Sequence, residues 1–190
     1  PAITGTKTFN QVLSLSNGTW SNSPLTYAYS WSSSATSNGT YTAISGATSN
    51  TYTLTTSDIG NFVKGTVTAT NSAGNSSATS IATTVITGIQ ITTPIAPTVT
   101  TVSGVLKSFS VTLSAAITGA ASYTIKVYDS ANTLVFTKSI NATAYTFTSA
   151  DYAFLDTTAY KASVTAIASP GYVDSAESAK STAAATTNTG

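Results

Sequence analysis

Apolar residues alternate with serine and threonine along short stretches of this chain, and residues typical of turns separate the stretches. The clearest stretch is Leu25–Trp31, LTYAYSW, in which every second residue is Leu, Tyr or Trp. Successive side chains of a strand point to opposite faces, so this pattern predicts a strand with one buried face. Strands separated by turns at intervals of about 8–12 residues are typical of a β-sandwich.

One motif occurs twice. YTLTTSD at Tyr52–Asp58 returns as YTFTSAD at Tyr145–Asp151. We interpret both copies as the same corner of two similar domains, with Tyr52, Leu54, Tyr145 and Phe147 facing inward and each Asp in a turn. The fold class predicted is therefore all-β, with two tandem immunoglobulin-like β-sandwich domains. We expect the domains at residues 1–88 and 98–183, a linker with Pro94 and Pro97 at 89–97, and a tail at 184–190.

The alternation predicts roughly seven strands in each half, and bounds can be given for six of them. In the first half they are Phe9–Ser16, Leu25–Trp31, Thr40–Ile44, Thr51–Thr55, Val63–Thr70 and Ser76–Ile86. In the second half they are Ser108–Ser114, Tyr123–Val127, Leu134–Ile140, Ala144–Thr148, Tyr160–Ile167 and Tyr172–Ser178. Only Ser175–Lys180 has a spacing that would suit a helix.

The composition excludes several classes of function. Charged residues make up 7% of the 190 residues, the net charge is +1, and the chain has no Arg, His, Cys or Met. Without a basic field we expect no nucleic-acid partner, and without an apolar run of about 18 residues we expect no membrane insertion. The absence of His and Cys excludes Ser-His and Cys-His nucleophiles and the preferred ligands of zinc. We therefore expect no enzyme, no cofactor and no metal site.

The remaining chemical candidates are carboxylates, lysines and aromatic residues. Asp151 and Asp156 could pair as a catalytic or calcium-binding couple, although a turn carboxylate that accepts backbone N–H groups is the favoured interpretation. Lys64, Lys126 and Lys161 are expected to face solvent, which argues against an isopeptide crosslink. Five aromatic residues could form a platform for a sugar. The alternation assigns Tyr27, Tyr29 and Trp31 to the core. Trp20 and Tyr41 stay candidate contacts for a glycan.

Several motifs resemble the Ig-like repeats of bacterial surface proteins and phage virion proteins over about residues 5–87. They are Gly18-Thr19-Trp20, Tyr29-Ser30-Trp31, Ile44–Thr48, Thr51–Leu54, Asp58-Ile59-Gly60 and Val67–Gly74. The resemblance implies that Trp31 is the core tryptophan of strand C, in a domain without the Cys pair of antibody domains. The second half resembles a fibronectin type III domain in Pro97, Tyr123–Ile125, Leu155 and Tyr160–Ala166, but lacks that family's strand B Trp. An Ig-like variant stays open for this half, with Tyr160 in the strand F position.

Serine and threonine number 69 of the 190 residues, and a surface made soluble by hydroxyls is typical of extracellular proteins. The function predicted is a structural or adhesive module of a cell surface, filament or virion assembly, and both ends of the chain suggest a piece of a longer protein. We expect its partners to be other protein subunits, including copies of itself by edge-strand addition, with Pro1–Thr8 as the donor or edge strand. A carbohydrate-binding module and a passive spacer stay open as alternatives.

Overall fold

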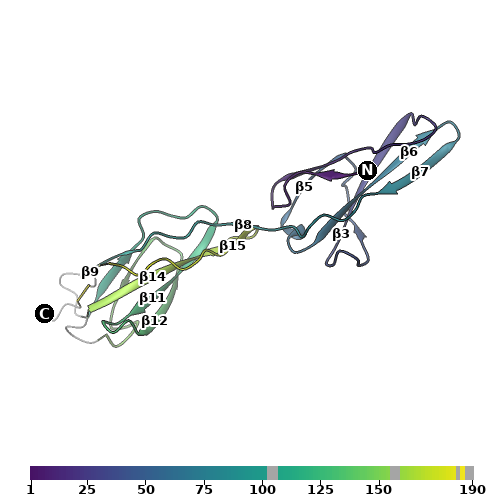
Figure 1. Cartoon of the computed structure of the whole chain (residues 1–190). Helices are drawn as coiled ribbons and strands as arrows, with labels where there is room; N and C mark the ends of the chain where they lie inside the picture. Colours follow the sequence, from purple (N-terminus) through teal and green to yellow (C-terminus); the bar gives the residue numbers. More distant parts are fainter. Residues whose placement is uncertain (102–106, 155–158, 183–184, 187–190) are drawn as a thin grey trace. The chain divides into compact units, whose positions relative to one another are not determined.

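The computed structural model describes residues 1–101, 107–154, 159–182 and the backbone of 185–186. The chain forms two compact units, Pro1–Ile89 and Gln90–Gly190, and Figure 1 shows that both are built from strands. Each unit is a sandwich of antiparallel sheets, which confirms the predicted fold class. No helix of the described residues is long and apolar enough to cross a lipid bilayer.

The first unit has two sheets, with strand orders β1-β2-β5 and β4-β3-β6-β7. A single 3₁₀ turn, Thr56–Asp58, follows β5 in this unit. The strands are β1 (Ile3–Thr4), β2 (Val12–Leu15), β3 (Thr26–Ser34), β4 (Thr42–Ala43), β5 (Thr51–Thr53), β6 (Phe62–Asn71) and β7 (Gly74–Thr79). The N-terminal residues are the edge strand β1, because Ile3 and Thr4 pair with Leu15 and Ser14 of β2.

The core of the first unit lies between its sheets. Leu13 and Leu15 of β2 meet Trp31 of β3 and Val63 and Val67 of β6 in one buried cluster. Inward residues of both sheets are apolar because the strands alternate, and their burial is the main driving force for such a sandwich. The indole N–H of Trp31 donates to the carbonyl of Ser49 at 2.8 Å, so the one polar atom of this side chain is satisfied.

Leu25 is an exception to the predicted inward face. Its side chain is 76% exposed, whereas Tyr27 and Tyr29 are half-buried and Trp31 is buried. Strand β3 begins only at Thr26, and the alternating face at its first residues extends past the end of the core. The prediction that Leu25 is buried was therefore wrong, although the alternation itself is correct.

The second unit contains sheets of order β13-β10-β9 and β12-β11-β14-β16, and a short pair β15-β8. The strands are β8 (Ile89–Gln90), β9 (Thr98–Thr101), β10 (Phe109–Thr112), β11 (Ala120–Tyr128), β12 (Leu134–Ile140), β13 (Ala144–Phe147), β14 (Ala159–Ala168), β15 (Tyr172–Val173) and β16 (Ala185–Thr186). The alternating apolar residues of the predicted strands Ser108–Ser114 and Tyr123–Val127 are buried, among them Phe109 and Ile125, which have no exposed surface.

Aromatic rings fill the centre of the second core, which has no tryptophan. The ring of Phe109 stacks on Phe147 and Tyr160, with centroids 5.2 and 5.5 Å away, and meets the edge of Phe154 at 5.0 Å. Offset stacked and edge-to-face pairs of this kind add to the free energy gained by burying the rings. Phe109 therefore holds together β10, β13 and β14, which belong to both sheets.

Near the end of each unit lies an extended segment whose hydrogen bonds repeat every third residue. In the second unit the N–H groups of Ser175, Ser178 and Ser181 donate to the carbonyls of Ala166, Val164 and Ala162. The hydroxyls of the same serines accept the N–H groups of these three β14 residues, at 2.9, 2.9 and 3.2 Å respectively. We call this segment, Ser175–Ser181, the second hydroxyl ladder.

The first unit contains the same arrangement along β6. Ser80 and Thr83 donate their N–H groups to Gly65 and Val63, and their hydroxyls accept the N–H groups of those residues at 3.1 and 2.9 Å. This first hydroxyl ladder comprises residues 80–86. Three residues of the ladder cover the same length as two residues of β6. The rise of the ladder is therefore about 2.2 Å per residue, compared with about 3.3 Å in a strand.

The ladders correct two predicted strands and one predicted helical stretch. Ser76–Ile86 is a strand only as far as Thr79, and Tyr172–Ser178 is a strand only at Tyr172–Val173. Ser175–Lys180 forms no helix. A spacing of three between hydroxyls looks helical in the sequence, but here it matches the side chains to alternate residues of the neighbouring strand.

The predicted domain bounds, with their linker and tail, stay a prediction. Within the region expected to be a linker, Ile91 lies in the buried cluster of the second unit, and Pro94 and Pro97 are also buried. Within the expected tail, the backbone of Ala185–Thr186 pairs with Ala159 and Tyr160 of β14. Leu155, assigned to a loop by the resemblance, lies outside the described residues.

Replacing Thr83 by Val tests the first ladder. The substitution keeps the shape of a side chain that is 8% exposed, but removes the hydroxyl that accepts the N–H of Val63. A buried donor left unsatisfied costs about 1–3 kcal/mol, so we expect the free energy of unfolding of the first unit to fall by about that amount. Both tryptophans belong to this unit, so their fluorescence during urea unfolding reports on it alone.

Thr83→Ser is the matched control, because it keeps the hydroxyl and loses only a methyl group. Equal losses of stability in Thr83→Val and Thr83→Ser would contradict the role of the hydroxyl in the ladder.

Candidate functional site

The two copies of the repeated motif form the same hydrogen-bonded corner. In the first copy the carboxylate of Asp58 accepts the hydroxyl of Tyr52 at 2.9 Å and the N–H of Thr55 at 2.7 Å. In the second copy the carboxylate of Asp151 accepts the hydroxyl of Tyr145 at 2.7 Å and the N–H of Thr148 at 3.1 Å. The prediction that these aspartates hold turns is confirmed.

The electrostatics of the two corners differ because only the second contains a lysine. The ammonium of Lys138 lies 2.9 Å from Asp151, whose side chain is 8% exposed. Burial of Asp151 disfavours its charge, but hydrogen bonds from Lys138, Tyr145 and Thr148 outweigh burial and lower the pKa of Asp151. In the first corner, burial and the hydrogen bond to Asp58 raise the pKa of Tyr52 to about 12.

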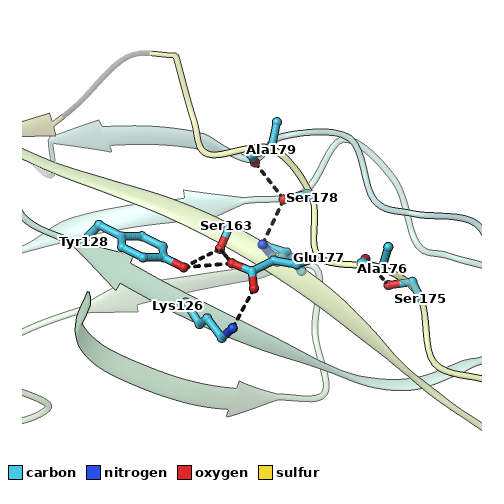
Figure 2. A network of polar contacts seen from close by, with 9 residues as sticks. Lys126, Tyr128, Ser163, Ser175, Ala176, Glu177, Ser178 and Ala179 are labelled. Carbon is cyan, nitrogen blue, oxygen red and sulfur yellow. Dashed lines mark hydrogen bonds and ion pairs between the residues drawn. The ribbon is translucent and has the colours of Figure 1, made fainter. Parts of the chain in front are cut away.

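A second cluster of titratable groups surrounds Glu177, as Figure 2 shows. One oxygen of the Glu177 carboxylate accepts the ammonium of Lys126 at 2.6 Å, and the other accepts the hydroxyls of Tyr128, at 2.8 Å, and Ser163. The hydrogen bonds from Lys126 and Ser163 are the main reason that the pKa of Glu177 is lowered to about 2. The ammonium of Lys180 lies 3.8 Å from the centre of the Tyr128 ring.

The Glu177 cluster combines a hydroxyl, a carboxylate and an ammonium, but its geometry does not suit nucleophilic catalysis. Ser163 has no exposed surface, so its hydroxyl cannot reach a substrate in solution. Glu177 belongs to the second hydroxyl ladder, and Lys126, Tyr128 and Ser163 belong to β11 and β14. The cluster therefore fastens the ladder to the outer face of its sheet. Lys126, which was expected to face solvent, is ion-paired with Glu177, and its side chain is 35% exposed.

The other described carboxylates also accept hydrogen bonds from backbone N–H groups. Asp129 accepts the N–H groups of Ala131 and Thr133, both at 2.9 Å, and Asp174 accepts the N–H of Ala168 at 2.7 Å. Asp156, the proposed partner of Asp151, lies outside the described residues. In the part of the chain that the structure describes, no three His, Cys, Asp or Glu residues lie close enough to hold a metal ion.

A polar hollow of about 260 Å³ lies in the first unit, beside the C-terminal end of β6. Its lining includes Trp20, Asn22, Asn71, Gly74 and Asn75. It lies between the loop before β3 and the turn that joins β6 to β7. We call it the Trp20 hollow.

Hydrogen bonds hold the walls of the Trp20 hollow. The indole N–H of Trp20 donates to the carbonyl of Asn17 at 2.6 Å, and the ring also packs against the core of the unit. The amide of Asn71 donates to the carbonyl of Asn22 at 2.8 Å and accepts the N–H of Ala73 at 2.9 Å. Asn71 thus joins the two loops that form the hollow.

Tyr41, the second candidate ligand contact, does not line this hollow. Its hydroxyl donates to the carbonyl of Ser37 at 3.1 Å, and its ring lies 4.2 Å from the ammonium of Lys64. Lys64 is near the start of β6, whereas the hollow lies near its end. The structure therefore does not combine Trp20 and Tyr41 in one aromatic platform.

The residues of the predicted core signature all lie in or against the two cores. Trp31, Leu54 and Tyr160 are at most 2% exposed. Tyr52 and Tyr145 are half-buried, and the Tyr52 ring lies 5.6 Å from that of Trp31. Their hydroxyls reach the aspartates at the rim, which explains why these rings are not fully buried.

Comparisons with known proteins identify similar solved structures at low sequence identity. The sequence matches no protein-family model, and it matches no curated protein. Among solved structures, the chain is similar to the chicken CNTN1 FN1-FN3 domains, at 14% identity and a TM-score of 0.44 over 98% of this chain and 65% of that chain. It is also similar to a two fibronectin type-III domain segment of chicken tenascin, at 12% identity and a TM-score of 0.44 over 94% of this chain and 95% of that one.

The chain thus spans 65% of the length of the first of these structures. The immunoglobulin-like sandwich fold of each unit rests on its own sheets and core. The bacterial or phage origin implied by the resemblance stays a prediction.

Trp20 was a predicted ligand contact, whereas the three asparagines around it were not predicted. Asn71 and Asn75 flank the turn between β6 and β7, and Asn22 lies in the loop that follows Trp20. In the sequence they look like ordinary turn residues, because nothing there shows that two distant loops are adjacent.

The pKa of Glu177 predicts how the second unit responds to acid. A carboxylate whose pKa is lowered on folding contributes stability above its unfolded pKa, and this contribution is lost as the pH falls towards the folded pKa. The stabilisation from Glu177 should therefore be complete above a pH of about 4.5, the pKa of the unfolded side chain, and should disappear as the pH falls to about 2. Glu177→Gln should lower stability at neutral pH and flatten this acid dependence.

Urea unfolding monitored by the amide NMR signals of Val164 and Ala166 would measure this effect within the second unit. Equal slopes of stability against pH in the parent and Glu177→Gln would contradict the assignment.

Proposed function

We propose that this chain is a non-catalytic structural module of an extracellular assembly, which associates with other subunits through the free edge of β12. The observation that carries the proposal is an edge strand that no other described strand covers on its outer side, and whose single lysine is bound within its own unit. A hydroxyl-rich, weakly charged surface supports an extracellular location.

The carboxylates support a non-catalytic role. Each described carboxylate accepts hydrogen bonds from residues of its own unit, either backbone N–H groups or the side chains around Glu177 and Asp151. General acid–base catalysis requires a titratable group within reach of a substrate proton. Carboxylates committed to turns and ladders are poorly placed for that function.

The two sides of the sheet that contains β14 differ in how their edges are closed. On one side the second hydroxyl ladder and β16 occupy the backbone groups of β14. On the other side β12 is the edge strand, and its seven residues make it the longest edge strand of the described chain. An edge of this length presents a row of backbone donors and acceptors to a neighbouring strand.

The pairing register shows which groups of β12 are free. Val164 donates to the ladder, so its partner Ile125 on β11 directs its own backbone groups towards Lys138 of β12. Because backbone direction alternates along a strand, the groups of Thr137 and Ser139 point away from the sheet. These residues would pair with an added strand.

Natural proteins often protect an edge strand with free charged side chains, especially lysine. On β12 the ammonium of Lys138 is instead bound to Asp151 at 2.9 Å and lies 4.9 Å from the centre of the Tyr145 ring. The start of the strand is apolar, and Leu134 is 48% exposed. An edge whose single lysine is ion-paired within its own unit, and which exposes a Leu, favours pairing with a neutral strand of another subunit.

The N-terminal segment is less suited to the donor role considered for it. Pro1–Thr8 contains strand β1, which already pairs with β2, and Thr8 bridges to Thr87. Deleting this segment would therefore destabilise the first unit as well as any assembly. A substitution on β12 separates these effects.

Thr137→Pro removes one outward N–H of β12 and leaves its bonds to β11 in place, because Pro is tolerated where an edge N–H faces solvent. We expect the self-association constant to fall at least about tenfold, since a lost hydrogen bond of about 1.4 kcal/mol corresponds to a factor of 10. Analytical ultracentrifugation over a concentration series measures the change.

Thr137→Val is the control, because it keeps the N–H and the β-branched shape. A parent that stays monomeric at every concentration, or equal weakening by Pro and Val, would contradict assembly through β12. A strictly monomeric parent would favour the passive spacer.

A further inference from the structure

We propose that the Trp20 hollow binds a neutral carbohydrate, as one sugar ring at the end of a glycan chain. This site lies in the first unit and is independent of the assembly proposed through β12. Four features of the hollow support the assignment: its neutral lining, its aromatic wall, its free amides and its fixed backbone.

The lining of the hollow contains no charged residue. It consists of one Trp, three Asn, and small or hydroxyl-bearing residues. A phosphate or carboxylate ligand would lose hydration without gaining an opposite charge there. A ligand rich in hydroxyls instead exchanges hydrogen bonds to water for bonds to amides and hydroxyls at little cost.

Trp20 supplies the apolar part of the site. A pyranose ring has one face of C–H groups, which packs against an aromatic ring, while its hydroxyls point outward around the rim. The indole N–H is bonded to the carbonyl of Asn17, and the ring packs against the core, so Trp20 is held in place before a ligand binds. Aromatic rings fixed in this way contribute contact area with little loss of conformational entropy.

The amides of Asn22 and Asn75 are available to a ligand. Asn71 uses its amide to join the two loops, whereas the side chains of Asn22 and Asn75 make no hydrogen bond to any described residue. Each amide offers donors and an acceptor, which match the hydroxyls of a sugar. Both residues belong to the lining, Asn22 from the loop before β3 and Asn75 from the start of β7.

The backbone around Asn22 is held in an uncommon conformation. Asn22 and Ser23 have φ values of 60° and 43°, in the left-handed region that non-glycine residues rarely adopt. Such conformations are concentrated at ligand sites, where the surrounding structure maintains them. The volume of about 260 Å³ is just below the range of about 300–1,000 Å³ for drug-sized pockets, which suits a single ring.

Affinity gel electrophoresis tests the proposal with the whole chain. The gels contain amylopectin, xylan or mannan as neutral polysaccharides, and alginate as an anionic comparison. We expect at least one neutral polysaccharide to retard the parent protein, and alginate to have no effect. Asn75→Ala and Asn22→Gly should each weaken this retardation about tenfold, the effect of one lost hydrogen bond. Glycine suits position 22 because it accepts the positive φ.

Asn38→Ala is the matched control, because Asn38 is exposed in the same unit and does not line the hollow. It should be retarded like the parent. Trp20→Ala should abolish retardation, but it also removes packing, so its fold is checked by the fluorescence of Trp31. Three results would overturn the proposal: no retardation of the parent by any neutral polysaccharide, retardation by alginate alone, or equal retardation of Asn75→Ala and Asn38→Ala.

Discussion

Serine and threonine hydroxyls that accept backbone N–H groups close one sheet edge in each of the two sandwiches. In each unit a serine or threonine accepts the N–H of the strand residue whose carbonyl accepts its own N–H, so one residue satisfies both groups. An ordinary strand would pair there through every second residue. The ladders close the parts of the β6 and β14 edges that β7 and β16 do not pair with. In the second unit, the described strands leave β12 as the long edge strand of the sheet that contains β14.

The chain has few charged residues, and its described carboxylates also hold the backbone in place through hydrogen bonds. The six acids of the chain are too few to form a charged surface, and the described ones fix corners, turns and the second ladder. The repeated motif shows how: Tyr and Thr three residues apart both contact an Asp three residues later. A buried carboxylate with several donors is stable in this setting, because the donors compensate for lost hydration. Both units use this corner, although only the second adds a lysine.

Alternation in the sequence was sufficient to predict the fold class and most inward faces. Phe109, Val111, Tyr123, Ile125 and Val127 are buried as predicted, because each lies within a strand that crosses the core. The prediction for Leu25 was wrong because alternation along a strand does not show where the core ends. The ladders were not predicted for a different reason. Hydroxyl residues spaced three apart can be recognised as a ladder only when the position of the neighbouring strand is known. The Trp20 hollow could be predicted only in part, because Asn22 and Asn75 become neighbours through the folding of distant loops.

The near absence of free charge limits how such a protein can recognise anything. With a net charge of +1 and the described carboxylates bound internally, no long-range field attracts a partner. Association would then proceed at the rates of about 10⁵–10⁶ M⁻¹s⁻¹ typical of neutral surfaces, and selectivity would come from shape and directed hydrogen bonds. Both proposed contacts have this character: a strand edge is recognised by its row of backbone groups, and a sugar by an aromatic face and amides. A scaffold stabilised by hydroxyls thus favours short-range recognition of neutral partners, whether another strand or a glycan.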